Sequence, residues 1–371
     1  MYFREVIGHQ NLKNRVRSAF RTGKLGHATM FTGREGYGSL PMVLALSRYI
    51  LCTNRSETDA CGVCTSCKKM DKLVHPDLHF VFPVVNKKGK DPVSDSYISD
   101  WRKFVYNTPY GSYVEWIKYI ASENSQGGIF KDESDTINRK LSLKSFESDY
   151  KIMIIWMAEK MNETAANKIL KVLEEPPLST IFLLISVHPE QLLQTIISRT
   201  QVIAVPPILS EDLVEFLEHS KGLESAEAKD LGVFAEGDLS KSLELIDKID
   251  ELQQNVQNFS QFLGYCKSQQ TSDILRFIDT NLGNDKTAQI EFLNYILHTV
   301  RYNILQNTSD QSAVNQSSGN LQNNVKLNLT LVQAKQLLRL LNEAIIHIER
   351  NVNARIVLMD VAIQIRKVLT V

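Results

Sequence analysis

Four of the five cysteines lie in one short stretch, at Cys52, Cys61, Cys64 and Cys67. The spacing C-x8-C-x2-C-x2-C lets consecutive thiolates converge on one ion, and four thiolates suit a closed tetrahedral Zn²⁺ site. An iron–sulfur cluster is one alternative, but its motif would continue with a fourth Cys followed by Pro, which is missing here. Unrelated buried thiols are the other alternative. His75 is a spare ligand that four cysteines make unnecessary, so we predict a structural zinc.

A glycine-rich turn follows a short apolar run in "HATMFTGREGYGSLP", residues 27–41. Gly33, Gly36 and Gly38 fit a phosphate-binding loop between a strand and a helix. The next two positions, where that motif has Lys and Ser/Thr, hold Ser39 and Leu40. Losing a cation about 4 Å from a phosphate forfeits roughly 4 kcal/mol at an effective dielectric of 20. We therefore expect a degenerate loop that does not bind ATP productively, or a glycine-rich turn in an unrelated α/β protein.

A second catalytic element is also incomplete. The apolar run 152–157 occupies the place where an ATPase strand ends in an acidic pair, and it ends in Trp156 and Met157. Glu159 comes two residues late. Because two separate elements lack their catalytic groups, we expect no ATP hydrolysis by this chain.

The elements that must position these residues alternate over the first 205 positions. Strands are predicted at 28–32, 78–82, 152–157, 181–186 and 202–205, and amphipathic helices at 10–22, 41–52 and 164–174. This alternation predicts a parallel sheet covered by helices.

Beyond Pro206 and Pro207 the pattern is helical throughout. Short helices are predicted at 210–219, 225–235 and 239–250, and longer ones at 251–266, 270–281, 286–307 and 330–369. The polar tract 306–324 has almost nothing to bury, so we expect a mobile loop there.

Residues 86–145 interrupt the sheet pattern and are interpreted as an insertion between two strands. Its aromatic residues could stack nucleic-acid bases, but we favour the interpretation that they dock the insertion onto the core. They are Trp101, Phe104, Tyr106, Tyr113, Trp116 and Tyr119.

The whole composition is that of a globular protein, with 43% hydrophobic and 23% charged residues among 371. Lys+Arg and Asp+Glu number 42 each, which argues against a protein that coats nucleic acid or an anionic membrane by itself. No apolar run is long enough for a transmembrane helix, and "MYFREVIGHQ" lacks the pattern of a signal peptide. We expect a cytoplasmic protein of two or three domains.

A set of motifs in a fixed order makes the chain similar to bacterial clamp-loader subunits of the AAA+ superfamily. They are "VIGHQNLKNRV", "GHATMFTG", "CGVCTSCKKM", "HPDLHFV", "NETAANKILKVLEEPPLSTIFLLIS" and "LLQTIISRTQVI". The resemblance covers about the first 205 residues apart from the insertion. It implies an α/β AAA+ nucleotide-binding-like domain at 1–206, a helical lid domain at 207–250 and an all-α collar domain at 251–371.

The resemblance also implies roles for single residues. The family's Ser-Arg-Cys signature stands here as Ser198-Arg199-Thr200, so Arg199 is expected to act as an arginine finger on a neighbour's ATP. A surface or salt-bridged arginine is the other interpretation. A lid-domain sensor arginine is expected near 237–245, where Ser240 stands.

The function implied is that of an ATP-inactive subunit of the DNA polymerase III clamp loader. Its expected partners are the motor (gamma/tau) and delta subunits, and through the assembled loader the sliding clamp and primed DNA. An ATP-hydrolysing motor subunit or another AAA+ ATPase is the alternative. A stand-alone zinc-dependent DNA-binding module is disfavoured by the zero net charge.

Overall fold

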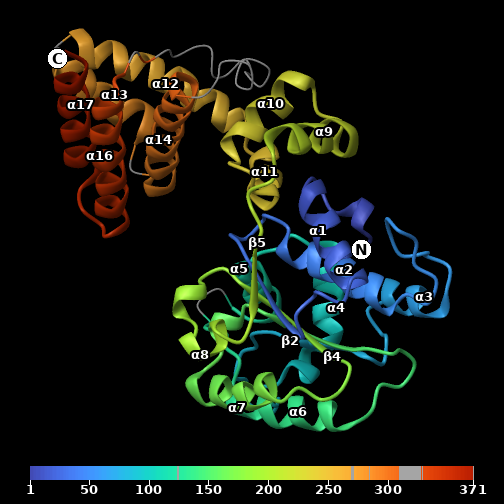
Figure 1. The fold of residues 1–371 in the computed structure, drawn as a ribbon. Coiled ribbons are helices and arrows are strands. Elements are labelled where there is room, and N and C mark those ends of the chain that lie inside the picture. Colours follow the sequence, from blue (N-terminus) through green and yellow to red (C-terminus); the bar gives the residue numbers. More distant parts are fainter. Residues whose placement is uncertain (123–124, 269–270, 284, 309–326, 328, 371) are drawn as a thin grey trace. The chain divides into compact units, whose positions relative to one another are not determined.

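A computed structural model describes residues 1–371 except 123–124, 269–270, 284, 309–326, 328 and 371 (Figure 1). The chain forms two compact units. The first comprises Met1–Leu213 with Gly237–Lys241, and the second Val214–Glu236 with Ser242–Val371. The helices expected to form a separate lid are thus shared between the two units, and the division into three domains stays a prediction.

The first unit is built on a five-stranded parallel sheet in the order β2-β3-β4-β1-β5. The strands are β1 (Ala28–Thr32), β2 (Leu78–Val81), β3 (Lys151–Trp156), β4 (Thr180–Ser186) and β5 (Gln201–Ala204). Each coincides with a predicted strand to within one residue at either end. The central strands β3 and β4 are buried along their whole length, which explains their continuous apolar runs.

Helices cover both faces of this sheet. Alternate strand residues such as Ile154 and Leu183 pack in one cluster with α2 (Ser39–Leu51) and α1 (Gln10–Arg21). Their neighbours Met153 and Phe182 pack in another cluster with α7 (Glu163–Glu174) and α6 (Lys131–Ser142). Strand periodicity of two sends successive side chains to opposite faces. The sheet and its helices, with a helical C-terminal half, confirm the predicted α/β AAA+ fold class.

The insertion between β2 and β3 contains α4 (Ile98–Asn107), α5 (Tyr113–Ile120) and α6. Trp101 is fully buried, stacked on Phe82 with ring centroids 4.3 Å apart, and lies 5.0 Å from Trp156. Phe104 and Trp116 belong to the same core cluster. These three aromatics dock the insertion, as expected. Tyr106 and Tyr119 differ, being 79% and 50% exposed.

The helices after the sheet form a separate apolar core. They are α9 (Ser210–Lys221), α10 (Ser225–Phe234), α11 (Leu239–Ile246), α12 (Ile249–Ser268), α13 (Thr271–Phe277), α14 (Lys286–Thr308), α16 (Leu331–Glu349) and α17 (Ala354–Thr370). The predicted tract 306–324 lies mostly outside the described residues.

Two predicted helical segments are interrupted. The segment 330–369 is two helices, because Asn351 adopts a left-handed backbone (φ 63°) and Asn353 Oδ1 accepts the N–H of Arg355 at the start of α17. Asparagine tolerates that conformation better than most residues. The segment 239–250 likewise ends at Ile246, and α12 begins three residues later.

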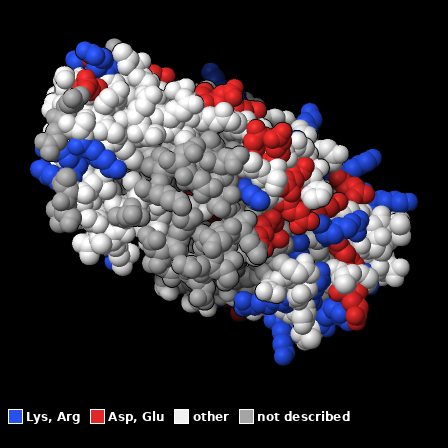
Figure 2. Space-filling view, turned by 90° about the horizontal axis from the view of Figure 1, so that it is seen from above, with Lys and Arg blue, Asp and Glu red and all other residues white. Residues whose placement is uncertain are grey.

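Surface charge is mixed. Figure 2 shows Lys and Arg interspersed with Asp and Glu on the face drawn, in keeping with the zero net charge. Within the described ranges, no helix is both long and apolar enough to cross a bilayer.

Candidate functional site

The glycine-rich loop joins β1 to α2, and its glycines are required by the backbone. Gly36 and Gly38 have φ values of +72° and +92°, and α2 begins at Ser39 directly after Gly38. A Cβ on Gly33 would lie 2.6 Å from the Val205 carbonyl oxygen. Only glycine accommodates such a close approach and such φ values without strain.

The side chains that follow the loop are placed for packing. Leu40, in the first turn of α2, is buried in the core cluster that α2 forms with the sheet. The Ser39 hydroxyl is buried and has no hydrogen-bond partner among the described atoms. The loop's own cation, Arg34, is exposed. The cavity above the loop measures about 20 Å³, far below the roughly 300–1,000 Å³ of ligand pockets.

The end of β3 carries apolar residues where an ATPase has an acidic pair. Trp156 is buried, and Met157 adopts a left-handed backbone with φ 54°. Glu159 Oε1 accepts hydrogen bonds from the backbone N–H groups of Val187 and His188, at 3.0 and 3.4 Å. Glu159 therefore braces the segment after β4, and its late position in the sequence matches that role.

Arg199 lies between α8 (Gln194–Ile197) and β5, directly after Ser198. Its side chain is 37% exposed, and one guanidinium nitrogen lies 2.6 Å from Glu174 Oε1 at the end of α7. A second donates to the Thr195 carbonyl at 3.0 Å. Sequence reasoning missed Glu174 as a partner. The available signal was a pair of carboxylates, Glu174 and Glu175, at a helix end ahead of two prolines.

The four cysteine thiols gather in one place. The Sγ atoms of Cys52, Cys61, Cys64 and Cys67 all lie within 4.8 Å of one another, and those of Cys52 and Cys64 are 3.9 Å apart. A tetrahedral ion with Zn–S bonds of about 2.3 Å requires sulfurs about 3.8 Å apart. His75 is not part of this group. The cluster could therefore hold a metal ion through sulfur alone.

Backbone groups around the sulfurs favour the thiolate form. The N–H groups of Cys61, Cys64 and Cys67 point to the sulfurs of Cys52, Cys61 and Cys64, at 3.3 to 3.4 Å. Burial opposes ionisation of Cys64, but hydrogen bonds from the Cys67 N–H and from Thr53 lower its pKa to about 6. Burial raises the pKa of Cys67. Such N–H donors are typical of metal-binding thiolates.

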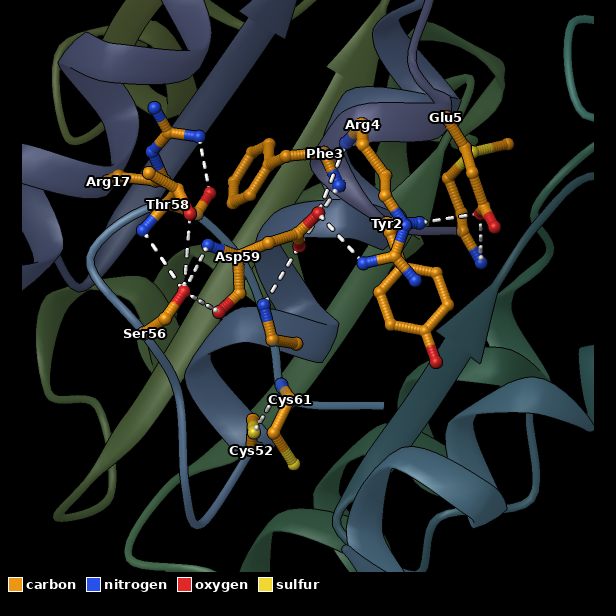
Figure 3. A network of polar contacts seen from close by, with 12 residues as sticks. Tyr2, Phe3, Arg4, Glu5, Arg17, Cys52, Ser56, Thr58, Asp59 and Cys61 are labelled. Atoms are coloured by element: carbon orange, nitrogen blue, oxygen red, sulfur yellow. Dashed lines mark hydrogen bonds and ion pairs between the residues drawn. The ribbon is translucent and has the colours of Figure 1, made fainter. Parts of the chain in front are cut away.

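The cysteine segment is also tied to the N-terminus (Figure 3). The Asp59 carboxylate accepts the backbone N–H groups of Phe3, Arg4 and Ala60, at 3.2, 3.1 and 2.8 Å. Nearby, the fully buried Arg48 pairs with Asp71 at 2.7 Å and donates to the Cys67 carbonyl at 3.2 Å. Both anchors fix the loop that carries the cysteines against α2 and the N-terminal turn.

Comparison with known proteins identifies the family of this chain. The family model described as "DNA polymerase III, delta subunit" matches residues 8–208, which contain the loop, the cysteines and Arg199. The chain belongs to this family. The resemblance to bacterial clamp-loader subunits is thereby confirmed.

Individual relatives carry two kinds of name. "DNA polymerase III subunit delta'" of Bacillus subtilis is 30% identical over 50% of this chain and 44% of its own length. The protein of the same name from Escherichia coli is 28% identical over 51% of this chain and 46% of its own length. "DNA polymerase III subunit gamma/tau" of Mycobacterium bovis is 26% identical over 53% of this chain and 27% of its own length. The chain thus matches less than half the length of each of these three relatives.

Proposed function

We propose that this chain is a non-catalytic, delta-prime-type subunit of a bacterial DNA polymerase III clamp loader. In this role it closes the loader ring with motor and delta subunits and supports ATP-dependent loading of the sliding clamp on primed DNA. The observation that carries the proposal is the family match over 8–208 combined with the chemistry of the loop within it. Relatives named gamma/tau also match about half of this chain, so the proposal depends on the loop residues to separate the two subunit types.

The loop chemistry argues against an ATP-hydrolysing subunit. A working phosphate loop needs a cation on the β- and γ-phosphates and a hydroxyl on Mg²⁺, and here Ser39 supplies no charge and Leu40 no oxygen. One carboxylate oxygen of Glu159, two residues past the position expected of an acidic pair, accepts backbone N–H groups of the segment after β4. A loop that keeps its glycines but lacks the phosphate-binding Lys and the Mg²⁺-binding hydroxyl suits a subunit whose AAA+ domain serves assembly.

Arg199 is our candidate for the residue that acts on a neighbour's ATP. Its guanidinium is partly exposed beside the edge strand β5, where it pairs with Glu174 and donates to the Thr195 carbonyl. A planar guanidinium can bind a γ-phosphate bidentately and stabilise charge in the transition state. The Ser198 hydroxyl donates to the same Thr195 carbonyl at 3.1 Å.

We also propose that Cys52, Cys61, Cys64 and Cys67 hold one structural Zn²⁺. Four sulfur ligands leave no open coordination position, so such an ion would cross-link the segment 52–67 and supply no catalysis.

The deciding experiment measures ATP turnover by the purified chain and by the loader reconstituted from motor, delta and this subunit. The chain alone should hydrolyse no ATP, and its addition should raise the rate of the motor and delta subunits on primed DNA. Turnover by the isolated chain that is lost on changing Ser39 or Glu159 would favour the motor-subunit alternative.

A further inference from the structure

The insertion reaches the phosphate loop through one tight turn, residues 108–111, which we call the Tyr110 turn. It joins α4 to α5, and the Gly111 N–H donates to the Thr108 carbonyl at 2.9 Å. Pro109, Tyr110 and Gly111 line the cavity above the loop opposite Gly33–Pro41. The cavity left between the turn and the loop has a volume of about 20 Å³, which is room for about one water molecule.

Tyr110 contacts three separate segments of the first unit. Its hydroxyl accepts the backbone N–H of Ile7 at 2.8 Å, and its carbonyl accepts the Ser240 hydroxyl at 2.7 Å. Its ring carbon Cε1 lies 3.1 Å from the position of a Cβ on Gly38. The side chain is buried, with 8% exposure. One residue of the insertion thus joins the N-terminal segment, the loop and the segment around Ser240.

Two further contacts attach the insertion to the same site. The Tyr113 N–H donates to Glu35 Oε1 at 2.7 Å, which gives a carboxylate in the loop a partner that an anionic ligand could not provide. Burial raises the pKa of Glu35, although the Tyr113 hydrogen bond opposes this. Trp156, at the end of β3, packs against Trp101 and Phe104 of α4, with ring centroids 5.0 and 6.5 Å apart.

We propose that the Tyr110 turn occupies the degenerate nucleotide site in place of a nucleotide. It fills the space above the loop and holds Ile7, the loop and Ser240 in one arrangement that neither requires nor admits a nucleotide. Ser240 stands where the resemblance implies a nucleotide-sensing arginine, and here it binds the turn. This role for the insertion goes beyond the proposed function, because it explains how the domain keeps its shape without ATP.

The first test adds millimolar MgATP or MgADP to the full chain and measures the thermal unfolding midpoint, together with binding of a fluorescent ATP analogue. A ligand that binds only the native state raises the midpoint by mass action. We expect no shift and no binding. A concentration-dependent rise would overturn the proposal, while leaving the ring role of the subunit to be judged by reconstitution.

The second test compares amide hydrogen exchange in wild type, Tyr110→Phe and Tyr110→Gly. Tyr110→Phe keeps the ring and the fold but removes the acceptor, so the Ile7 amide should exchange roughly three- to tenfold faster, the usual worth of one hydrogen bond. Tyr110→Gly should extend faster exchange to the loop and to residues 239–241. The control is Tyr106→Phe, on the exposed side of α4, which should change none of these amides. Unchanged exchange at Ile7 in both Tyr110 variants would refute the proposal.

Discussion

At the scale of residues, the pair of Arg199 and Glu174 bears directly on the proposed arginine finger. The ion pair at 2.6 Å joins two exposed side chains. Exposed pairs contribute at most about 1 kcal/mol, so a phosphate could displace Glu174 at small cost. We interpret the pair as a resting position for the arginine.

Arg199→Ala should leave the chain folded and slow ATP hydrolysis in the reconstituted loader. An arginine supplied in trans can contribute about 10³–10⁵-fold to the rate at one site. The total ATPase rate should therefore fall by the fraction that the site next to Arg199 contributes. The measurement is steady-state ATPase on primed DNA, with Arg139→Ala, another exposed arginine, as the control. Equal rates for both variants would remove Arg199 from this role.

Glu174→Gln should release the arginine without removing it. Because the exposed pair is weak, the apparent affinity of the neighbouring site for ATP should improve by no more than about fivefold, with the unfolding free energy nearly unchanged. The readout is KM for ATP in the loader. A loss of activity comparable to that of Arg199→Ala would mean that Glu174 holds the arginine in its working position.

The cysteine cluster permits a direct measurement. Metal analysis of the purified chain should find about one zinc, and Cys61→Ser should lose it and lower the thermal unfolding midpoint. Cys266→Ala, at the separate buried cysteine of α12, should retain the zinc. Since ligands must be thiolates, zinc should also dissociate as the pH falls. A zinc-free protein of full stability would exclude the structural site.

At the scale of elements, Asp77 ties the end of the insertion to the start of β2. Its buried carboxylate accepts the backbone N–H groups of Phe146, Glu147 and Ser148, at 2.5, 2.8 and 2.9 Å. Asp77→Ala leaves three donors without their acceptor and should lower the free energy of unfolding by about 2–3 kcal/mol. Urea denaturation measures this. Asp95→Ala, which removes a single ion pair with Lys140 at the surface, should cost under about 1 kcal/mol.

His79 on β2 predicts how stability depends on acid. Burial, with Lys140 and Lys151 nearby, lowers its pKa from 6.5 to about 4, although Asp77 and Asp95 act in the other direction. The unfolded chain therefore binds this proton first as the pH falls. Stability due to the neutral imidazole should be present above pH 6.5 and decline towards pH 4. His79→Gln should flatten that part of the stability profile, and an unchanged profile would contradict the assignment.

The sequence predicted these elements well where periodicity was strong. Buried runs such as 152–157 could be only central strands between amphipathic helices, and each was found within one residue. The break at Asn351 was missed because its left-handed backbone depends on local packing as well as residue type. Cysteine spacing was sufficient to predict a gathered cluster. The contacts of Tyr110 were not predictable, since they join residues more than 100 positions apart.

At the scale of the whole molecule, the chain combines two units with different architectures. The first surrounds a parallel sheet and carries the loop, the cysteines and Arg199, and the second is helical. The family match ends at residue 208, close to the start of the helical half. The proposed site residues therefore all belong to the first unit.

The aromatic cluster of the insertion gives the protein an optical property. The chain has three tryptophans, and Trp101, Trp116 and Trp156 all lie in that one cluster, with Trp101 within 5.2 Å of both others. Tryptophan emission should therefore respond to undocking of the insertion, while the helical unit, which has no tryptophan, stays dark. A shift of this emission to longer wavelength during thermal unfolding should therefore report loss of the tryptophan cluster in the first unit, without a contribution from the helical unit.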